Sequence, residues 1–336
     1  MKIPYKSFTF TMEAEDEILL PSYKGSTFRG AFGMQFKKVV CALRKEHCRT
    51  CLLRQKCIYA YVFESPSPEE DNVLGRVNSI PHPFVIEPPE ETKQRYISGQ
   101  TFSIGLVLVG EAIQYLPYFI YTFDQLGKNG IGRGRGRCAL QKVHADGPQG
   151  EIKLIYCSGT GKIESFHREC IELSQPAMQV LQEDVSNGAY TVPGEITLRF
   201  LTPTRLKYEG KLATDPEFHI FIRQLLRRLF LLRHYYCKDS QGDDTSATEG
   251  YHRMLIEEAR TVKIKESNFK WHDWERYSRR QDTRMKLGGF QGDIVYKGAL
   301  APFYPFLKAG EILHIGKGTS FGLGKYVIGT YHELAR

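Results

Sequence analysis

The stretch His-Ile-Gly-Lys-Gly-Thr-Ser-Phe-Gly-Leu-Gly-Lys-Tyr, residues 314–326, lies near the C-terminus and is the most informative part of the sequence. Glycine tolerates positive φ angles and lets the backbone approach a ligand, and successive N–H groups can then bind an anion. Lysine ammonium groups add positive charge that suits phosphate. We therefore expect a loop that binds a nucleic-acid backbone through Gly316, Lys317, Gly318, Thr319, Ser320, Gly322, Gly324 and Lys325.

Familiar phosphate-binding loops do not match this stretch. The spacing before Gly324-Lys325 is one residue too long for a Walker A loop, and Tyr326 replaces the Ser or Thr that would hold magnesium. A dinucleotide fingerprint opens a helix. Here the apolar segments Glu311–Ile315 and Tyr326–Tyr331 predict strands on both sides of the loop. The alternative to nucleic-acid binding is a glycine-rich hairpin turn without a ligand.

Composition limits the class of protein. The 336 residues are enough for two domains of ordinary size, and 41% hydrophobic with 25% charged residues is typical of a soluble globular protein. The net charge of +8 favours a polyanionic partner without proving one. We see neither a secretory signal at Met1 nor an apolar run long enough to span a membrane, so we expect a cytoplasmic protein with reduced thiols and no membrane partner.

Four of the eight cysteines cluster with the spacing C-x6-C-x2-C-x5-C: Cys41, Cys48, Cys51 and Cys57. The central pair can present two sulfurs to one ion, and the outer two cysteines can complete a tetrahedral site. Basic residues between them would offset the charge of four thiolates. We predict a structural zinc ion, with an iron–sulfur cluster and a set of unliganded thiols as the alternatives.

The chain divides near residues 190–195, where turn residues follow a predicted helix at Glu169–Ser186. We predict an N-terminal domain at residues 1–190 and a C-terminal domain at residues 191–336. Each half reads as β-α-β-β-α-β, with a glycine-rich basic loop before the last strand. This order predicts an α+β protein of two tandem ferredoxin-like (RRM-like) domains, the first with a small four-cysteine metal-knuckle insertion at about residues 41–57.

Apolar spacing and a second basic loop support this organisation. Phe8, Phe10 and Met12 alternate as in a strand, and Phe28, Phe32 and Phe36 follow at helical spacing. The second loop, Gly127–Arg137, alternates glycine with arginine. Its arginines Arg133, Arg135 and Arg137 can all reach phosphates or stack on bases, and the alternative is a solvated turn.

Several motifs together resemble a known family. They are the 316–324 loop, Trp274–Gln281, Leu287–Asp293, Phe303-Tyr-Pro-Phe-Leu307, Lys24–Gly33 and Pro83–Pro89. In these motifs the sequence is similar to the RAMP superfamily of CRISPR-associated proteins and, within it, to the endoribonucleases that process precursor crRNA. The four cysteines, Tyr61-Val-Phe-Glu64 and Pro83–Pro89 resemble a cysteine-bearing branch of that family.

The resemblance implies a reaction and partners. A ribose 2′-hydroxyl of the CRISPR repeat RNA attacks the adjacent phosphorus without a catalytic metal, and the upstream product keeps a 2′,3′-cyclic phosphate. This chemistry needs a base, an acid and cations for the charged phosphorane. The implied partners are CRISPR repeat RNA, crRNA and other CRISPR effector subunits.

The resemblance also suggests catalytic residues, because family members often place a histidine, a tyrosine and a lysine around the first helix. Tyr23 and Lys24 precede that helix, and His47 follows it between Cys41 and Cys48. We predict His47 as the base, with a solvent-exposed histidine or a substitute zinc ligand as the alternative. Arg29 is expected to bind RNA and, with Tyr23 and Lys24, could act through positioning and charge.

Two other functions remain open. The first is a non-catalytic RAMP subunit that holds guide RNA in an effector complex, which the lack of a histidine on the first helix favours. The second is a zinc-containing DNA-binding protein. It ranks last, because the cysteine spacing does not match a finger with a recognition helix.

Overall fold

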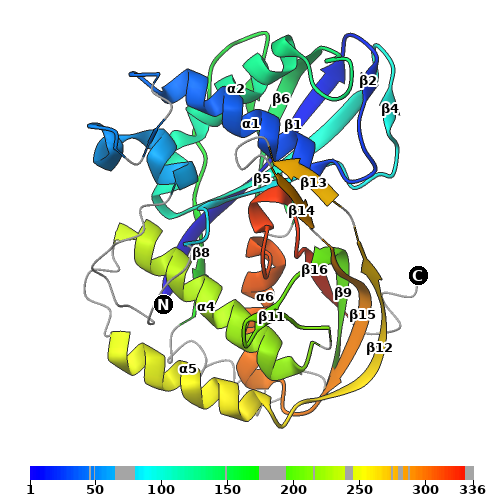
Figure 1. The fold of residues 1–336 in the computed structure, drawn as a ribbon. Helices are drawn as coiled ribbons and strands as arrows, with labels where there is room; N and C mark the ends of the chain where they lie inside the picture. The colour runs from blue at the N-terminus through cyan, green and yellow to red at the C-terminus, as the bar shows by residue number, and fades with distance from the viewer. Residues whose placement is uncertain are drawn as a thin grey trace. The chain divides into compact units, whose positions relative to one another are not determined.

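The computed structural model describes residues 1–44, 47–48, 50–64, 80–147, 150–173, 194–214, 216–238, 245–273, 275–278, 283–286 and 288–329. The chain forms two compact units (Figure 1). We call Pro4–Cys170 together with Tyr235–Lys238 the N-terminal unit. Met1–Ile3, Ile171–His234 and Asp239–Arg336 make up the C-terminal unit.

The N-terminal unit is built on an antiparallel sheet with strand order β3-β5-β1-β6-β7, and β8 pairs with β1. Strands β2 and β4 form a two-stranded ribbon. This ribbon is joined to the second glycine-rich loop, Gly127–Arg137, which we call the arginine-rich loop, since Leu19 bridges to Arg133. The elements are β1 (Lys2–Ala14), β2 (Ile18–Leu19), α1 (Gly25–Val40), β3 (Phe84–Glu87), β4 (Arg95–Tyr96), β5 (Thr101–Val109), α2 (Leu116–Asn129), β6 (Cys138–Asp146), β7 (Ile152–Cys157) and β8 (Glu169–Glu172).

Aromatic side chains fill the core of this unit. Phe10 of β1 and Phe32 of α1 both contact Phe123 of α2, each with ring centroids 4.7 Å apart. Phe28 and Phe36 are buried on the same face of α1. The alternation in β1 and the helical spacing in α1 are therefore confirmed, and they place both helices against one face of the sheet.

The C-terminal unit repeats this plan. Its antiparallel sheet has the order β12-β15-β9-β16, with two short ribbons, β10–β11 and β13–β14. The elements are β9 (Glu195–Thr204), β10 (Lys207–Tyr208), β11 (Lys211–Leu212), α4 (Phe218–Tyr236), α5 (Thr245–Ala259), β12 (Lys263–His272), β13 (Glu275–Ser278), β14 (Thr283–Lys286), β15 (Gly289–Lys297), α6 (Tyr304–Leu313) and β16 (Tyr326–Gly329).

Polar anchors and aromatic contacts fix this second core. The buried Tyr326 hydroxyl of β16 donates to the carbonyl of Leu307 at 2.6 Å, which joins the last strand to α6. Phe200 of β9 and Phe290 of β15 pack edge to face at 4.9 Å. As a result, the loop between α6 and β16 starts and ends on fixed elements.

The predicted order β-α-β-β-α-β is present in both units, as β1-α1-β3-β5-α2-β6 and β9-α4-β12-β15-α6-β16. In each, the first strand lies between the third and the fourth of the set. The chain is thus a mixed α/β protein with antiparallel sheets, and this arrangement fits the tandem ferredoxin-like prediction.

Two predicted elements are wrong. Residues Glu169–Glu172 form strand β8, not the start of a helix, and the rest of the predicted helix from residue 174 lies outside the described residues. Residues 311–313 end α6, because Phe306, Gly310 and Leu313 share its buried face at helical spacing. The predicted domain boundary at 190/191 also falls outside the described residues and stays a prediction, as do parts of the Trp274–Gln281 motif.

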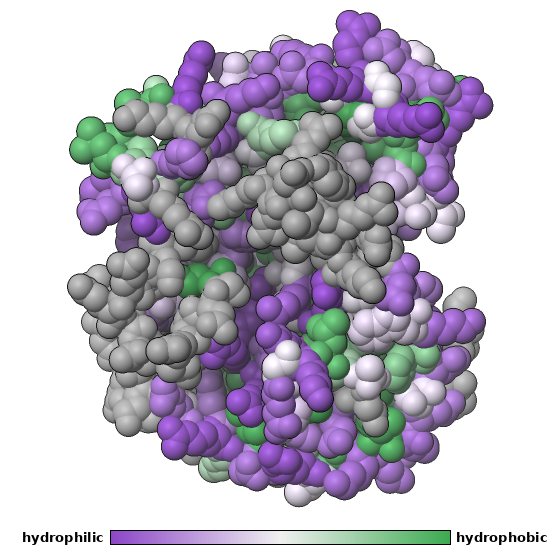
Figure 2. Space-filling model, in the orientation of Figure 1, coloured by the Kyte–Doolittle hydropathy of each residue, from purple (hydrophilic) through white to green (hydrophobic). Residues whose placement is uncertain are grey.

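The surface in view is largely hydrophilic, with small apolar patches (Figure 2). Within the described ranges, none of the helices combines the length and apolarity that a membrane crossing requires.

Candidate nucleic-acid interface

The glycine-rich loop at 314–325 connects α6 to β16 and is held by specific backbone contacts. The Thr202 hydroxyl of β9 donates to the Gly322 carbonyl at 2.9 Å and accepts the Lys325 N–H at 2.9 Å. The N–H of Lys317 donates to the Arg205 carbonyl at 3.0 Å. The predicted strand before the loop is a helix, so the loop is a helix-to-strand connection and not a hairpin.

Arg228 of α4 fixes the entry to this loop. Its buried guanidinium donates to the Leu313 carbonyl from Nε at 3.0 Å and from Nη2 at 2.8 Å, and to the His314 carbonyl at 3.1 Å. These carbonyls are left over at the C-terminal end of α6, where a cation is stabilising. His314 itself is buried with a positive φ of 59°. The loop therefore leaves α6 in one defined direction.

The glycines of the loop have a conformational reason to be there. Gly316, Gly318, Gly322 and Gly324 all have positive φ, which side chains with a Cβ adopt only with strain. At Gly324 a Cβ would lie 1.8 Å from the Ile315 carbonyl oxygen. Turn geometry thus accounts for the glycines without a ligand, and only the charges of the loop and its neighbours favour binding of a nucleic acid.

Two of the charged residues beside the loop, Arg205 and Lys207, were missed by the sequence analysis. The Lys317 side chain is exposed along part of its length, and partial burial of its ammonium, together with the nearby charges of Lys207 and Arg205, lowers its pKa. Three cations therefore gather beside the glycine-rich loop. Thr319 and Ser320 are buried, and Lys325 is half-buried at the start of β16.

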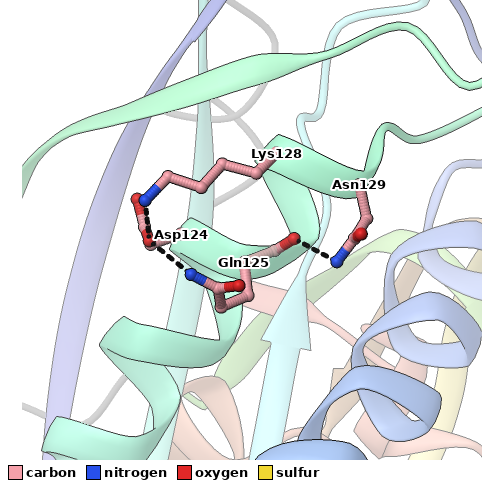
Figure 3. Close-up of polar contacts among 4 residues, drawn as sticks. All are labelled: Asp124, Gln125, Lys128 and Asn129. Carbon is pink, nitrogen blue, oxygen red and sulfur yellow. Dashed lines mark hydrogen bonds and ion pairs between the residues drawn. The ribbon is translucent and has the colours of Figure 1, made fainter.

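The arginine-rich loop of the N-terminal unit follows α2. The end of α2 is tied by polar contacts: Lys128 pairs with Asp124 at 2.7 Å, and the Asn129 side-chain amide donates to the Gln125 carbonyl at 2.7 Å (Figure 3). In the loop, Arg133 donates its N–H to the Leu19 carbonyl at 2.9 Å. The loop is consequently pinned to β2.

The three arginines of this loop are not equivalent. Arg133 and Arg135 are exposed, and neither side chain has an ion pair within the part of the chain that the structure describes. Arg137 forms a double contact with Asp16, from Nε at 2.8 Å and from Nη2 at 3.3 Å. Its guanidinium lowers the pKa of Asp16. Two of the three predicted RNA-binding arginines are therefore available, and the third is already paired with a carboxylate.

The residues at the start of α1 are more enclosed than the sequence analysis anticipated. Lys24 is 1% exposed, and its ammonium donates to the Glu91 carbonyl. Burial raises the pKa of the Tyr23 hydroxyl. Arg29 lies over the Phe63 ring at 4.9 Å and donates to His82 Nε2 at 3.2 Å. Lys24 and Arg29 thus both anchor α1 to other segments of the unit.

His47 and the cysteines lie in the segment after α1. His47 is exposed, and Cys41, Cys48, Cys51 and Cys57 are half-buried free thiols. The Cys51 N–H donates to the Cys48 carbonyl at 3.3 Å, as in a tight turn. Burial raises the pKa of the Cys48 thiol, against the opposing effect of Lys37. Among the described residues, no three His, Cys, Asp or Glu side chains are grouped as a metal site needs. The zinc ion therefore stays a prediction.

Comparison with known families identifies the C-terminal unit. Residues 198–326 match the model of the CRISPR-associated endoribonuclease Cas6, and residues 3–168 match a model described only as an N-terminal domain. The C-terminal unit thus matches a Cas6-family domain, which agrees with the RAMP-type resemblance of the sequence, whereas the cysteine-bearing branch stays a prediction. The glycine-rich loop lies inside the matched range.

Similarity to individual proteins extends over most of the chain. An uncharacterized protein of Archaeoglobus fulgidus is 27% identical over 315 residues, which cover 92% of each chain. A solved Cas6 product complex has a TM-score of 0.54 and 16% identity, covering 97% of this chain and 99% of that chain. Thermus thermophilus Cas6 gives a TM-score of 0.51 and 14% identity over the same shares. At these identities the structures show a shared Cas6-like fold.

Proposed function

Given the Cas6-family domain of its C-terminal unit, we propose that the protein is an endoribonuclease that binds CRISPR repeat RNA and cleaves precursor crRNA without a catalytic metal. The match of residues 198–326, with the cationic glycine-rich loop inside it, is the observation that carries the proposal. Other CRISPR effector subunits are proposed as further partners.

In the proposed reaction, the ribose 2′-oxygen attacks the adjacent phosphorus while its proton passes to a base. The bond from phosphorus to the 5′-oxygen then breaks, and that oxygen takes a proton from an acid. The upstream fragment keeps a 2′,3′-cyclic phosphate, and the downstream fragment begins with a 5′-hydroxyl. No step requires a metal, because proton transfer and cationic stabilisation of the phosphorane are sufficient in principle.

The enclosed and exposed positions around α1 suggest different roles. His47 is exposed, so its imidazole is the best candidate for the base. Burial raises the pKa of the Tyr23 hydroxyl, which keeps it protonated and rules it out as the base, so its proposed role is to donate a hydrogen bond or a proton. Lys24 is held by the Glu91 carbonyl, so its proposed role is to position the start of α1.

The four clustered cysteines are proposed to hold a structural zinc ion. The tight turn between Cys48 and Cys51 and the half-buried thiols support this, and no catalytic step passes through the metal. The test is elemental analysis of the purified protein: about one zinc per chain is expected, and a protein with neither zinc nor iron would rule out the metal.

A second candidate function is the non-catalytic RAMP subunit that only holds guide RNA. The burial of Lys24 and its contact with the Glu91 carbonyl favour it, since one of the three predicted catalytic groups is thereby removed from solvent.

A denaturing gel separates the two functions. Repeat RNA is incubated with the protein in EDTA, next to the same RNA with a single 2′-deoxy nucleotide at the cleavage position. The proposal expects one cut in the all-ribose RNA, none in the 2′-deoxy RNA, and about 10²–10⁴-fold slower cleavage by His47→Ala. Binding of the all-ribose RNA without cleavage would support the non-catalytic subunit instead.

A further inference from the structure

The segment between β9 and β10 carries two cations next to the glycine-rich loop. Leu206 is fully buried, whereas the flanking Arg205 is half-buried and Lys207 is exposed. The Arg205 carbonyl accepts the Lys317 N–H at 3.0 Å, and a Cβ on Gly316 would lie 2.5 Å from the same oxygen. The loop and the segment are therefore in direct backbone contact.

The charges of Arg205 and Lys207 both act on Lys317, and none of the three side chains pairs with a carboxylate among the described residues. Lys207 and Arg205 both lower the pKa of Lys317, after the effect of burial. Burial also lowers the pKa of Arg205, whose Nε is buried without a hydrogen-bond partner among the described residues. None of the three forms an ion pair in the described part of the chain, whereas Arg199 on the preceding strand is paired with Asp293 at 2.8 Å. Unbalanced charge of this kind is resolved when an anion binds.

The surrounding hairpin is attached to α4 by specific contacts. The Gln224 side chain of α4 donates to the Lys207 carbonyl, which attaches β10 to the helix. Next in sequence, the Tyr208 ring is held between His219 and the Arg223 guanidinium, each 5.7 Å from it. The cations thus lie on a backbone that is anchored to α4, and such pre-organisation lowers the entropic cost of binding a ligand.

We propose that Arg205, Lys207 and Lys317 form one phosphate-binding site that holds a backbone phosphate of bound RNA. The inference rests on the proposed function and adds two residues outside the glycine-rich loop. Lys207 and Lys317 are exposed, so a phosphate of a polymer backbone can reach both side chains from solvent. Lysine supplies point charge to a phosphate oxygen, and the fork of Arg205 adds directed hydrogen bonds.

The first test measures binding of a fluorescein-labelled single-stranded repeat RNA over a range of KCl concentrations. Arg205→Gln, Lys207→Gln and Lys317→Gln should each weaken binding roughly tenfold and reduce the salt slope by about 0.7. The matched control is Lys308→Gln in the same unit, because the Lys308 ammonium is already paired with Glu311 at 2.7 Å. Arg205→Lys, which keeps the charge, should retain most of the affinity and shows whether Arg205→Gln acts by unfolding.

The second test is acetylation of lysines by an amine-reactive ester, read by mass spectrometry on the wild-type protein. Lys207 and Lys317 should be protected by RNA, and Lys308 should not. A parallel sample contains inorganic phosphate at millimolar concentration in place of RNA. If phosphate alone protects both lysines to the same extent as RNA does, the site binds free phosphate and the assignment to RNA is overturned.

The outcomes separate this inference from the proposed function. Wild-type affinity in all three glutamine variants, with cleavage intact, would overturn the inference and leave the endoribonuclease standing. Affinity that depends on the three residues in a protein that never cuts repeat RNA would support the inference and overturn the endoribonuclease. A wild-type protein that binds no RNA would overturn both.

Discussion

The two glycine-rich loops look alike in sequence and differ in their electrostatic surroundings. In the N-terminal unit, Arg137 is paired with Asp16, and the loop is pinned to β2 through Arg133. In the C-terminal unit, Lys317 lies beside two further cations and no carboxylate balances them within the described residues. Glycine content predicts where a loop turns. The charges on neighbouring segments decide how strongly that loop attracts an anion.

The largest expected difference between the loops is in stability. Gly324→Ala should lower the free energy of unfolding by about 3 kcal/mol or more, because its Cβ would lie 1.8 Å from the Ile315 carbonyl oxygen at a φ of 75°. Gly134 has a φ of 88°, but a Cβ there would have no atom within 4 Å. Gly134→Ala should therefore lower the free energy of unfolding by only roughly 1 kcal/mol. Thermal melting of both variants measures this. Equal melting temperatures would show that the two loops are equally constrained.

A second stability effect should appear only at the C-terminal loop. Arg228→Met removes three buried hydrogen bonds to the end of α6 and should cost roughly 2 kcal/mol. The folded fraction of Arg228→Met should also bind RNA more weakly, because the glycine-rich loop would no longer leave α6 in one defined direction. Urea unfolding and RNA titration on the same sample check both. An unchanged unfolding midpoint would contradict the role given to Arg228.

The sequence predicts a structural feature well when the residues that form it lie close together along the chain, and poorly when they lie far apart. Local periodicity predicted strand β1 and helix α1 of the N-terminal unit through Phe8, Phe10 and Phe32. Leu313 and Ile315 alternate locally like a strand, which hid the end of α6. The partners of Arg137 and Lys24 lie 121 and 67 residues away, and such contacts leave no local pattern. Arg205 and Lys207 could have been found, since these two basic residues flank the apolar Leu206 in the sequence.

RNA binding should distinguish the arginines within one loop. Replacing both Arg133 and Arg135 by Gln should reduce the salt slope by about 1.4, at about 0.7 for each phosphate contact. Arg137→Gln should change it much less, because Asp16 already neutralises that guanidinium. Anisotropy titrations at several salt concentrations measure the slopes. Equal slopes for all three single variants would mean that the ion pair opens when RNA binds.

The smallest expected effect is the pH dependence of the Asp16–Arg137 pair. Arg137 lowers the folded-state pKa of Asp16, so the pair stabilises the fold at pH values above the ordinary Asp pKa. That contribution is lost as the pH falls through the lowered pKa. Both groups are exposed, so the change should be small. Asp16→Asn should remove this pH dependence and slightly raise RNA affinity by releasing Arg137. If Asp16→Asn and the wild-type protein have identical acid-unfolding curves and identical RNA affinity, the Asp16–Arg137 pair has neither of the two effects.

The most direct test of the central claim is the mass of the upstream RNA product that the full-length protein makes from repeat RNA in EDTA. Our account predicts a single fragment ending in a 2′,3′-cyclic phosphate, which is lighter by one water than the corresponding 3′-phosphate, and a downstream fragment with a 5′-hydroxyl. Intact RNA, or fragments that appear only with an added divalent metal and carry a 5′-phosphate, would contradict it.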